Sequence, residues 1–417
     1  MRNTENKDII NFIYILVSFP PIIHQNSIRA LEISKRLVKE RISPIFLTQK
    51  ISKKSQVNYS LLNELPPSLK IYRTFYFESI NRYRFFIFFN IFRLAFFLGV
   101  LPLLFLKIKK LLRKKRNIKF IYASGPHFYT HIIGYLLKKK SNLPLIVEYR
   151  DPWSFNPYNE EKVPWLFKKI DLSIEKRILK SADLIITVSS ALNDFMRNKF
   201  PILKNKPIYS IANGLNIKKI EKYSKPDAEN IIFTFTGTLY DKRSIEPLLM
   251  IISRLKNEKF FDNFKFLIKI FGTHRGIDLK DIIKRLRIEN LVYLGGMIPR
   301  SKALDEILKS DLAIHIGENL DYPTIAFKVW DYLSCQKKIL YLGNENTYTA
   351  NFIKENNFGT IIPINNLEHG KKRLKRLLND IKNNKYDNSI DNEKLRDFTW
   401  EKKAKKFLKI VINKIVK

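Results

Sequence analysis

The sequence predicts an α/β protein with two Rossmann-like, doubly wound parallel-sheet domains that face each other across a cleft. Short apolar segments of strand length alternate with segments of helical periodicity along the chain, which is typical of parallel sheets covered on both faces by helices. The chain has 417 residues, which is too long for one core of ordinary size, and 45% of them are hydrophobic, which is typical of a folded protein. Two domains of similar size follow from these observations.

The expected strands divide evenly between the two halves of the chain. In the first half they are 12–17, 43–47, 120–123, 145–149, 184–188 and 207–211, with helical patterns such as 27–40 and 128–139 between them. In the second half they are 231–236, 265–271, 291–294, 312–316, 338–342 and 359–362. Ligands of such sheets bind beyond the carboxyl ends of the strands, so functional residues are expected in the loops that follow them.

The join between the domains is expected near residues 213–230. Ala212-Asn213-Gly214 marks a turn there, and Lys225-Pro226-Asp227 marks a linker. We therefore place the first domain at residues 1–222 and the second at residues 223–397.

The charge balance is strongly positive. The chain has 76 Lys and Arg against 39 Asp and Glu, a formal net charge of +37, which attracts nucleic acid or anionic membrane lipid. Clusters lie at Lys107–Arg116, directly after the apolar segment 85–106, and at Lys138–Lys140. A membrane span over 85–106 is disfavoured because its uninterrupted apolar part, 94–106, is too short. The alternatives are an interfacial helix and a helix packed on the domain's own sheet.

Cysteine content and the N-terminal segment bear on location. The single cysteine, Cys335, excludes a disulfide within the chain and fits a reducing cytoplasm. The apolar run Ile9–Phe19 lacks the basic flank and the small-residue cleavage site of a signal peptide, and Pro20-Pro21 ends it. We expect it to form the first strand.

The segment Pro323–Cys335 is the most informative part of the sequence. At about 100° per residue, Thr324, Lys328, Asp331 and Cys335 would share one face of a helix whose opposite face is apolar. Thr324 would cap this helix and leave free N–H groups beside Lys328, a combination that binds an anion such as a diphosphate. Asp331 could accept hydrogen bonds from a diol such as a ribose. The alternative is an ordinary solvated helix face.

Three strand-end loops of the first half carry polar groups. His24 and Asn26 follow the first strand, and His127 opens the helix after the third. For His127, catalysis and an ordinary helix-cap or surface role are alternatives. Arg150 and Asp151 follow the fourth strand, where chemistry and a structural salt bridge are alternatives.

In the second half, Gly237 ends the first strand, and Lys242 and Arg243 precede a helix that Ser244 can cap. Two cations at a helix N-terminus are unfavourable because the helix dipole is positive there. A bound anion would offset this repulsion.

Several segments appear in the order found in glycosyltransferase family 4. They are Ser124–His127, Glu148–Trp153, Ser181–Ser189, Ile211–Leu215, Phe235–Leu239 and Phe327–Leu333. The resemblance implies the GT-B fold, a nucleotide-sugar donor held mainly by the second domain and an acceptor held by the first. It also implies retention of anomeric configuration and no bound metal. A subgroup with Asp-Pro-Trp after the fourth strand is the most similar.

The resemblance assigns roles to residues of the second domain. Asp331 resembles the carboxylate that holds the donor ribose, and Lys328 lies beside the diphosphate on the same helix. Lys242 or Arg243, following Gly237, resembles the phosphate-binding base. Met297, just after a glycine pair, would meet the nucleotide base through backbone groups.

The chain also departs from the family pattern. Asp331 stands where the family usually has the longer Glu, and Pro323 stands where a second Glu is usual. Arg150 replaces a common histidine, and His24-Gln25-Asn26 replaces a common glycine pair in the first loop.

The expected function is that of a retaining glycosyltransferase for a cell-surface polysaccharide or glycolipid. It would use a UDP- or GDP-linked donor without a metal or other cofactor, and would be cytoplasmic and peripheral at the inner face of the cell membrane. His24 and Asn26 would bind the acceptor, and Asp151, Arg150 and His127 are the catalytic candidates. The resemblance also implies that residues 398–417 form a helix that crosses back to the first domain.

Two alternatives remain open at this point. One is another GT-B nucleotide-sugar enzyme, such as an epimerase. The other is a non-catalytic basic binding protein of the same fold. Nucleic acid is not an expected partner, because the basic residues are not interleaved with a recognition motif.

Overall fold

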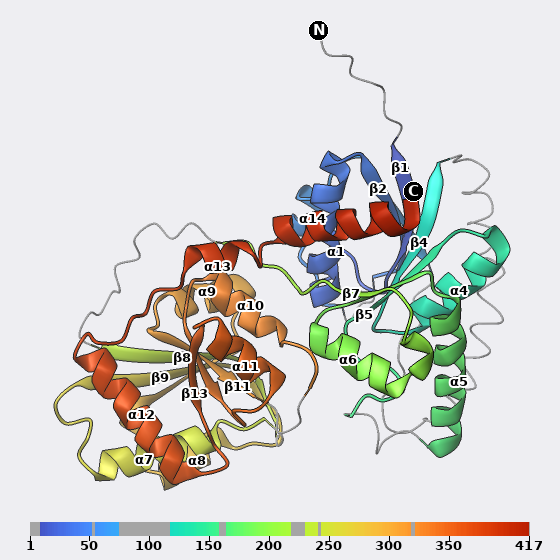
Figure 1. The fold of residues 1–417 in the computed structure, drawn as a ribbon. Helices are drawn as coiled ribbons and strands as arrows, with labels where there is room; N and C mark the ends of the chain where they lie inside the picture. The colour runs from blue at the N-terminus through green and yellow to red at the C-terminus, as the bar shows by residue number, and fades with distance from the viewer. Residues whose placement is uncertain are drawn as a thin grey trace. The chain divides into compact units, whose positions relative to one another are not determined.

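The computed structural model divides into two compact units (Figure 1). The first comprises Met1–Asn213 and Trp400–Lys417, and the second comprises Gly214–Thr399. The structure describes residues 9–51, 55–74, 117–157, 164–217, 230–240, 243–317 and 322–416. The predicted interfacial segment 85–106, the basic cluster 107–116 and the predicted boundary at 222/223 lie outside the described residues.

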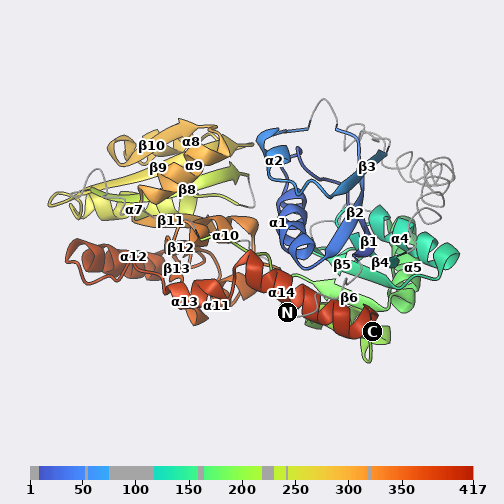
Figure 2. The same ribbon diagram turned by 90° about the horizontal axis from the view of Figure 1, so that it is seen from above.

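The described part of the first unit contains a seven-stranded sheet in the order β3-β2-β1-β4-β5-β6-β7. Figure 2 labels β1 to β6 and Figure 1 labels β7. Neighbouring strands are parallel throughout, as in the register Phe12↔Pro44 between β1 and β2. The strands are β1 (Ile10–Ile15), β2 (Ile42–Gln49), β3 (Lys70–Thr74), β4 (Ile118–Ser124), β5 (Leu145–Tyr149), β6 (Leu184–Thr187) and β7 (Ile208–Ser210).

Helices cover both faces of this sheet because alternate side chains of each strand point to opposite faces. Phe12 and Tyr14 pack with α1 (Gln25–Lys39) and α14 (Trp400–Val411). Ile13 and Ile15 belong to the core on the opposite face. The helices there are α4 (Tyr129–Ser141), α5 (Trp165–Ser181) and α6 (Ser190–Lys199). Shorter elements are α2 (Ser60–Asn63), η1 (Pro201–Leu203) and the π-helix η3 (Ile412–Val416).

The second unit repeats this plan. Its described residues form a six-stranded sheet in the order β10-β9-β8-β11-β12-β13, again parallel. The strands are β8 (Asn230–Leu239), β9 (Lys265–His274), β10 (Val292–Gly296), β11 (Leu312–Ile316), β12 (Ile339–Leu342) and β13 (Gly359–Ile362). The prediction of two doubly wound parallel-sheet domains is therefore confirmed.

The faces of the second sheet are also distinct. Phe233 and Phe235 of β8 pack with α7 (Glu246–Asn257), α8 (Leu279–Arg285) and α12 (Leu367–Lys382). Thr236 faces the other way, toward α10 (Phe327–Ser334), which packs beside α9 (Arg300–Leu308). The remaining elements are η2 (Glu289–Leu291), α11 (Tyr348–Glu355) and α13 (Asn392–Arg396).

One strand was not predicted. The segment β3 lies at the edge of the first sheet and pairs only with β2 among the described strands. Its sequence, Lys-Ile-Tyr-Arg-Thr, has no continuous apolar run, because an edge strand is less covered than a central one. This explains why the pattern of central strands did not reveal it.

None of the described helices combines the length and the apolar character needed to cross a lipid bilayer.

Candidate functional site

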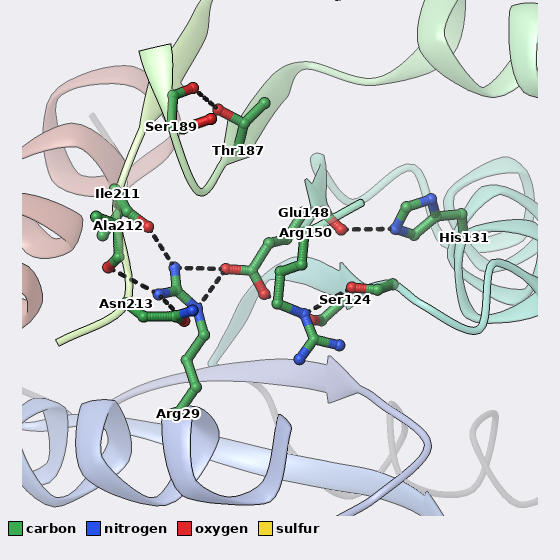
Figure 3. A network of polar contacts seen from close by, with 11 residues as sticks. Arg29, Ser124, His131, Glu148, Arg150, Thr187, Ser189, Ile211, Ala212 and Asn213 are labelled. Carbon is green, nitrogen blue, oxygen red and sulfur yellow. Dashed lines mark hydrogen bonds and ion pairs between the residues drawn. The ribbon is translucent and has the colours of Figure 1, made fainter. Parts of the chain in front are cut away.

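A buried ion pair lies at the carboxyl end of the first sheet (Figure 3). Arg29 of α1 and Glu148 of β5 are 2% and 0% exposed. The Nε and Nη2 atoms of Arg29 lie 2.9 and 2.7 Å from Oε1 of Glu148, and the Ser124 hydroxyl donates to Oε2 over 2.5 Å. Burial alone would raise the pKa of Glu148, but Arg29, Arg150 and Ser124 outweigh it and hold this pKa below its usual value.

The other donors of Arg29 bind the chain that follows β7. Arg29 donates to the carbonyl oxygens of Ile211 at 2.8 Å and Ala212 at 2.9 Å, and to Oδ1 of Asn213 at 3.3 Å. Figure 3 shows the guanidinium between these groups and Glu148. One side chain therefore joins α1, β5 and the last residues of the first unit before Gly214.

Arg150 lies beside this pair and binds the loop after β4. Its Nε donates to the Gly125 carbonyl at 2.6 Å, and its Nη2 donates to the Pro126 carbonyl at 3.2 Å. Asn26 Nδ2 donates to the same Pro126 carbonyl at 3.1 Å. The first loop, the loop that carries His127 and the end of β5 are thus brought together, as the strand-end prediction required.

His24 has a defined structural role in this cluster. It is the N-cap residue of α1, and its Nδ1 accepts a hydrogen bond from the Asn26 N–H at 3.3 Å. Burial and the nearby Arg150 charge lower the pKa of His24, so its neutral form is favoured. Asn26 is 6% exposed. The binding roles predicted for His24 and Asn26 stay predictions, now for residues that also shape the loop.

The loop after β5 is fixed from its outer side. Trp153 stacks on Phe128 with ring centres 5.1 Å apart. The buried Glu175 of α5 accepts from the Ser154 N–H at 3.0 Å. Burial raises the pKa of Glu175 to about 7. Asp151 lies within this braced loop. Burial lowers the pKa of its neighbour Arg150, and Glu148, Tyr14 and Asp151 oppose this lowering in that order.

Sequence reasoning did not single out Arg29, Glu148 or Glu175. A signal for Arg29 was present, because it lies one and two helical turns before the buried Ile33 and Leu37 of α1. A charge in register with a helix's apolar face requires a buried partner. The partner is 119 residues away in sequence, so its identity depended on the order of the strands.

In the second unit, β8 and β9 approach closely at two glycines. Gly237 and Gly272 are register partners, and a Cβ on Gly272 would lie 1.7 Å from the Gly237 carbonyl oxygen. Gly237 has φ of +149°, and a Cβ there would lie 2.7 Å from Cε of Lys328. The Lys328 side chain therefore crosses over Gly237, and its Nζ lies 3.4 Å from the Thr236 hydroxyl.

Cationic groups gather around this point. Arg243 donates to the Ile316 carbonyl at 3.1 Å. Burial, Arg243 and Lys328 together lower the pKa of the buried His315 well below its usual value. Burial, Arg243 and Arg300 lower the pKa of Lys328, and the Asp331 carboxylate opposes this. We call these residues the α10 cluster: Gly237, Arg243, Arg300, His315, Lys328 and Asp331.

The acidic member of the α10 cluster is not isolated. Arg300, at the start of α9, forms an ion pair with Asp331. Its guanidinium carbon lies 6.0 Å from the centre of the Phe327 ring. Asp331 is only 16% exposed in its side chain, whereas Arg300 is 48% exposed. Arg300 is a further site residue that sequence reasoning missed.

The predicted helix over Pro323–Cys335 is wrong at both ends. The helix α10 begins at Phe327, its N-cap residue is Ala326 with φ of −59° and ψ of 140°, and this cap makes no side-chain hydrogen bond. Thr324 therefore does not cap it. Cys335 is 0% exposed, so it does not belong to a ligand-facing stripe. The central pair, Lys328 and Asp331, remains on the face that carries the cationic groups.

The structure gives less information on the other residues that were predicted near the nucleotide-sugar site. Lys242 lies outside the described residues. Ser244 accepts from the Glu246 N–H at 3.1 Å, although the N-cap residue of α7 is Ile245. Met297 follows Gly296 at the end of β10 and is 75% exposed. Its contact with a nucleotide base remains a prediction.

Comparison with known proteins agrees with this arrangement. Residues 27–219 match the model of Glycosyltransferase Family 4. The chain is of the GT-B type and resembles this family. An uncharacterised glycosyltransferase of Methanocaldococcus jannaschii is 24% identical over 250 residues, which are 58% of this chain and 61% of that protein. The chain thus aligns with less than two thirds of this relative's length.

Solved structures share the GT-B fold over nearly the whole chain. A sucrose-phosphate synthase from Thermosynechococcus elongatus superposes with a TM-score of 0.67 at 14% identity, covering 97% of this chain and 98% of that one. A UDP-forming trehalose-phosphate synthase from Burkholderia xenovorans superposes with a TM-score of 0.64 at 12% identity, covering 97% and 99%. At these identities the likeness establishes the fold of both units.

Proposed function

We propose that this GT-B protein is a glycosyltransferase that moves a sugar from a nucleotide-sugar donor to a glycan or lipid-linked acceptor. The observation that carries the proposal is the α10 cluster, where Arg243 and Lys328 meet at the end of β8 with Asp331 on the same helix as Lys328. Crowded cations in a partly buried place favour binding of an anion, because the anion relieves their mutual repulsion.

The donor would bind through its diphosphate and its ribose. Arg243 and Lys328 would contact the diphosphate and offset the negative charge that grows on it as the sugar departs. Asp331 would accept hydrogen bonds from the ribose hydroxyls. A uridine nucleotide is the preferred candidate, in keeping with the UDP-forming synthase that shares the fold. No metal is required for this charge balance.

The acceptor would bind the first unit at the loops that hold His24, Asn26, His127, Arg150 and Asp151. In the expected retaining reaction, the bond from the anomeric carbon to the phosphate oxygen breaks, and a bond to the acceptor oxygen forms on the same face. The acceptor proton would pass to the leaving phosphate. Asp151 would anchor the acceptor or act as a base.

The formal net charge of +37 supports a place at the inner face of the cell membrane, where anionic lipid and lipid-linked acceptors are found. A cell-surface polysaccharide or glycolipid is the corresponding product class. The protein would be a cytoplasmic protein that is bound peripherally to the inner face of the membrane.

A thermal-shift series with UDP, GDP and UDP- or GDP-sugars tests the donor site, since a ligand specific for the folded state raises its melting temperature. The variants Lys328→Ala and Asp331→Ala should each lose the shift. Lys372→Ala removes one exposed cation from α12, which covers the opposite face of the sheet, and should keep it. A full shift in the Lys328 and Asp331 variants would contradict the donor assignment.

The transfer reaction needs its own assay. Labelled sugar from the donor that gives the largest shift should appear in a membrane glycolipid extract supplied as acceptor. Conversion of the nucleotide sugar into an isomer without transfer would indicate an epimerase and refute the proposal.

A further inference from the structure

The outward face of α5 exposes large apolar side chains in the first unit. Trp165, Leu166 and Ile170 are 66%, 51% and 46% exposed. At 100° per residue, these three positions lie within an arc of about 140° on the helix. Single exposed apolar residues are common, but adjoining ones mark a surface that contacts a partner.

The same face continues toward the C-terminus of α5 as a basic surface. Lys169, Lys176, Arg177 and Lys180 are exposed on this arc. The Nζ atom of Lys169 lies 4.6 Å from the centre of the Trp165 ring. Apolar and basic side chains are therefore interleaved on one face.

The acidic residues of α5 lie elsewhere. Glu175 is 1% exposed and bound to the Ser154 N–H, so it points into the protein. Asp171 is about 240° from Trp165 on the helical wheel. The outward arc of α5 therefore has basic but no acidic side chains.

The neighbouring helix adds basic residues near the C-terminal end of α5. Helix α4 packs beside α5 (Figure 1) and has Lys138, Lys139 and Lys140 in its last turn. Lys138 forms an ion pair with Asp183, which follows the C-terminal end of α5. Lys139 and Lys140 are exposed. We call the outward arc of α5 together with this last turn of α4 the α5 face.

We infer that the α5 face docks the protein on an anionic lipid surface. Trp165, Leu166 and Ile170 would enter the headgroup region, and the basic residues would contact lipid phosphates. This combination of tryptophan, aliphatic residues and lysines is that of an interfacial helix. Protein–protein interfaces are depleted in lysine, which argues against a protein partner.

This inference rests on the proposed peripheral attachment of the protein to the membrane. It names the α5 face as the surface through which the protein would attach. It is independent of the donor site, because the α5 face and the α10 cluster belong to different units. The basic residues supply the attraction between separated surfaces, and the apolar residues supply the insertion.

Co-sedimentation with vesicles tests the inference, using phosphatidylcholine alone and phosphatidylcholine with 30% phosphatidylglycerol. The full chain should bind the anionic vesicles and release them in high salt. Reversal of Lys169, Lys176, Arg177 and Lys180 to Glu should weaken binding at least 100-fold. Serine at positions 165, 166 and 170 should weaken it at least tenfold.

A matched charge reversal controls for net charge. Lys372, Arg376, Lys382 and Lys385 are exposed residues in and just after α12 of the second unit. Their change to Glu alters the formal charge by the same amount and should weaken binding much less. The UDP thermal shift, measured on every variant, should stay at its wild-type value.

The outcomes separate the hypotheses. If the charge reversals on α5 and on α12 weakened vesicle binding equally, net charge alone would account for the binding, and the assignment of the α5 face would be overturned. Absence of wild-type binding to anionic vesicles would overturn it as well, as would a wild-type dimer that the serine variant dissociates. Loss of vesicle binding with an intact UDP shift supports the α5 face, whereas loss of the UDP shift alone counts against the donor site.

Discussion

Breaking the buried ion pair of the first unit should cost far more stability than removing an exposed charge from the same helix. In Arg29→Met, Glu148 would keep its Ser124 hydrogen bond but lose the guanidinium that lies 2.7 Å away. Removal of one partner of a buried pair costs about 3–5 kcal/mol, because an uncompensated charge remains. The carbonyl oxygens of Ile211 and Ala212 would also lose their donors.

Thermal unfolding of the full chain measures this effect on the transition of the first unit. A loss of about 4 kcal/mol at about 3 °C per kcal/mol gives a decrease of about 12 °C in its melting temperature. Lys39→Met, at an exposed position near the end of α1, should change it by less than about 2 °C. Similar decreases in the two variants would refute the argument that the pair organises this unit.

The pH dependence has a defined sign. The folded-state pKa of Glu148 lies below its ordinary value, so the pair contributes stability above that ordinary value. The contribution is lost as pH falls through the folded-state pKa. The stability gap between the wild type and Glu148→Gln should therefore narrow in acid, as measured by urea unfolding at several pH values.

Three further predictions concern the loops and the α10 cluster. Gly237→Ala places a Cβ 2.7 Å from Cε of Lys328 at φ +149°, so UDP affinity measured by calorimetry should fall at least tenfold. Arg300→Ala should weaken UDP binding about tenfold and uridine binding less, because it would remove positive charge near the proposed diphosphate site; equal losses of UDP and uridine binding would contradict this. Burial raises the pKa of Glu175 to about 7, so this group disfavours folding once pH exceeds its ordinary value, and increasingly up to about 7. Glu175→Gln should therefore raise the melting temperature at pH 8 relative to the wild type, and by less at pH 5.

The central strands could be predicted from sequence because their chemistry is local. Both ends of β5 and β11 were predicted correctly, since each is a short apolar run that strands on either side bury. Both ends of β13 were also predicted correctly, because this edge strand still ends in two buried isoleucines. The edge strand β3 lacks that burial and gave no comparable signal. The start of α10 was misplaced by four residues, because the composition of residues 323–326 does not exclude a helix although the chain there is not helical.

The candidate site was predictable only in part for the same reason. Lys328 and Asp331 are one helical turn apart, so the spacing alone placed them together. Arg300 reaches Asp331 from another helix, and Arg29 reaches Glu148 across 119 residues of sequence. Contacts of that kind depend on strand order and register, which single-sequence periodicity does not specify.

The two charge clusters differ in a way that separates structural charge from functional charge. Arg29 and Glu148 stabilise each other's ionised forms, since the pKa of the acid is lowered and that of the base is raised. Their charges are compensated within the first unit, and a ligand would gain little from them. In the α10 cluster burial lowers the pKa of Lys328, Arg243 and Arg300 add to this lowering, and Asp331 opposes it. Such a cluster is stabilised by an added anion, and this is the physical reason to look for the diphosphate there.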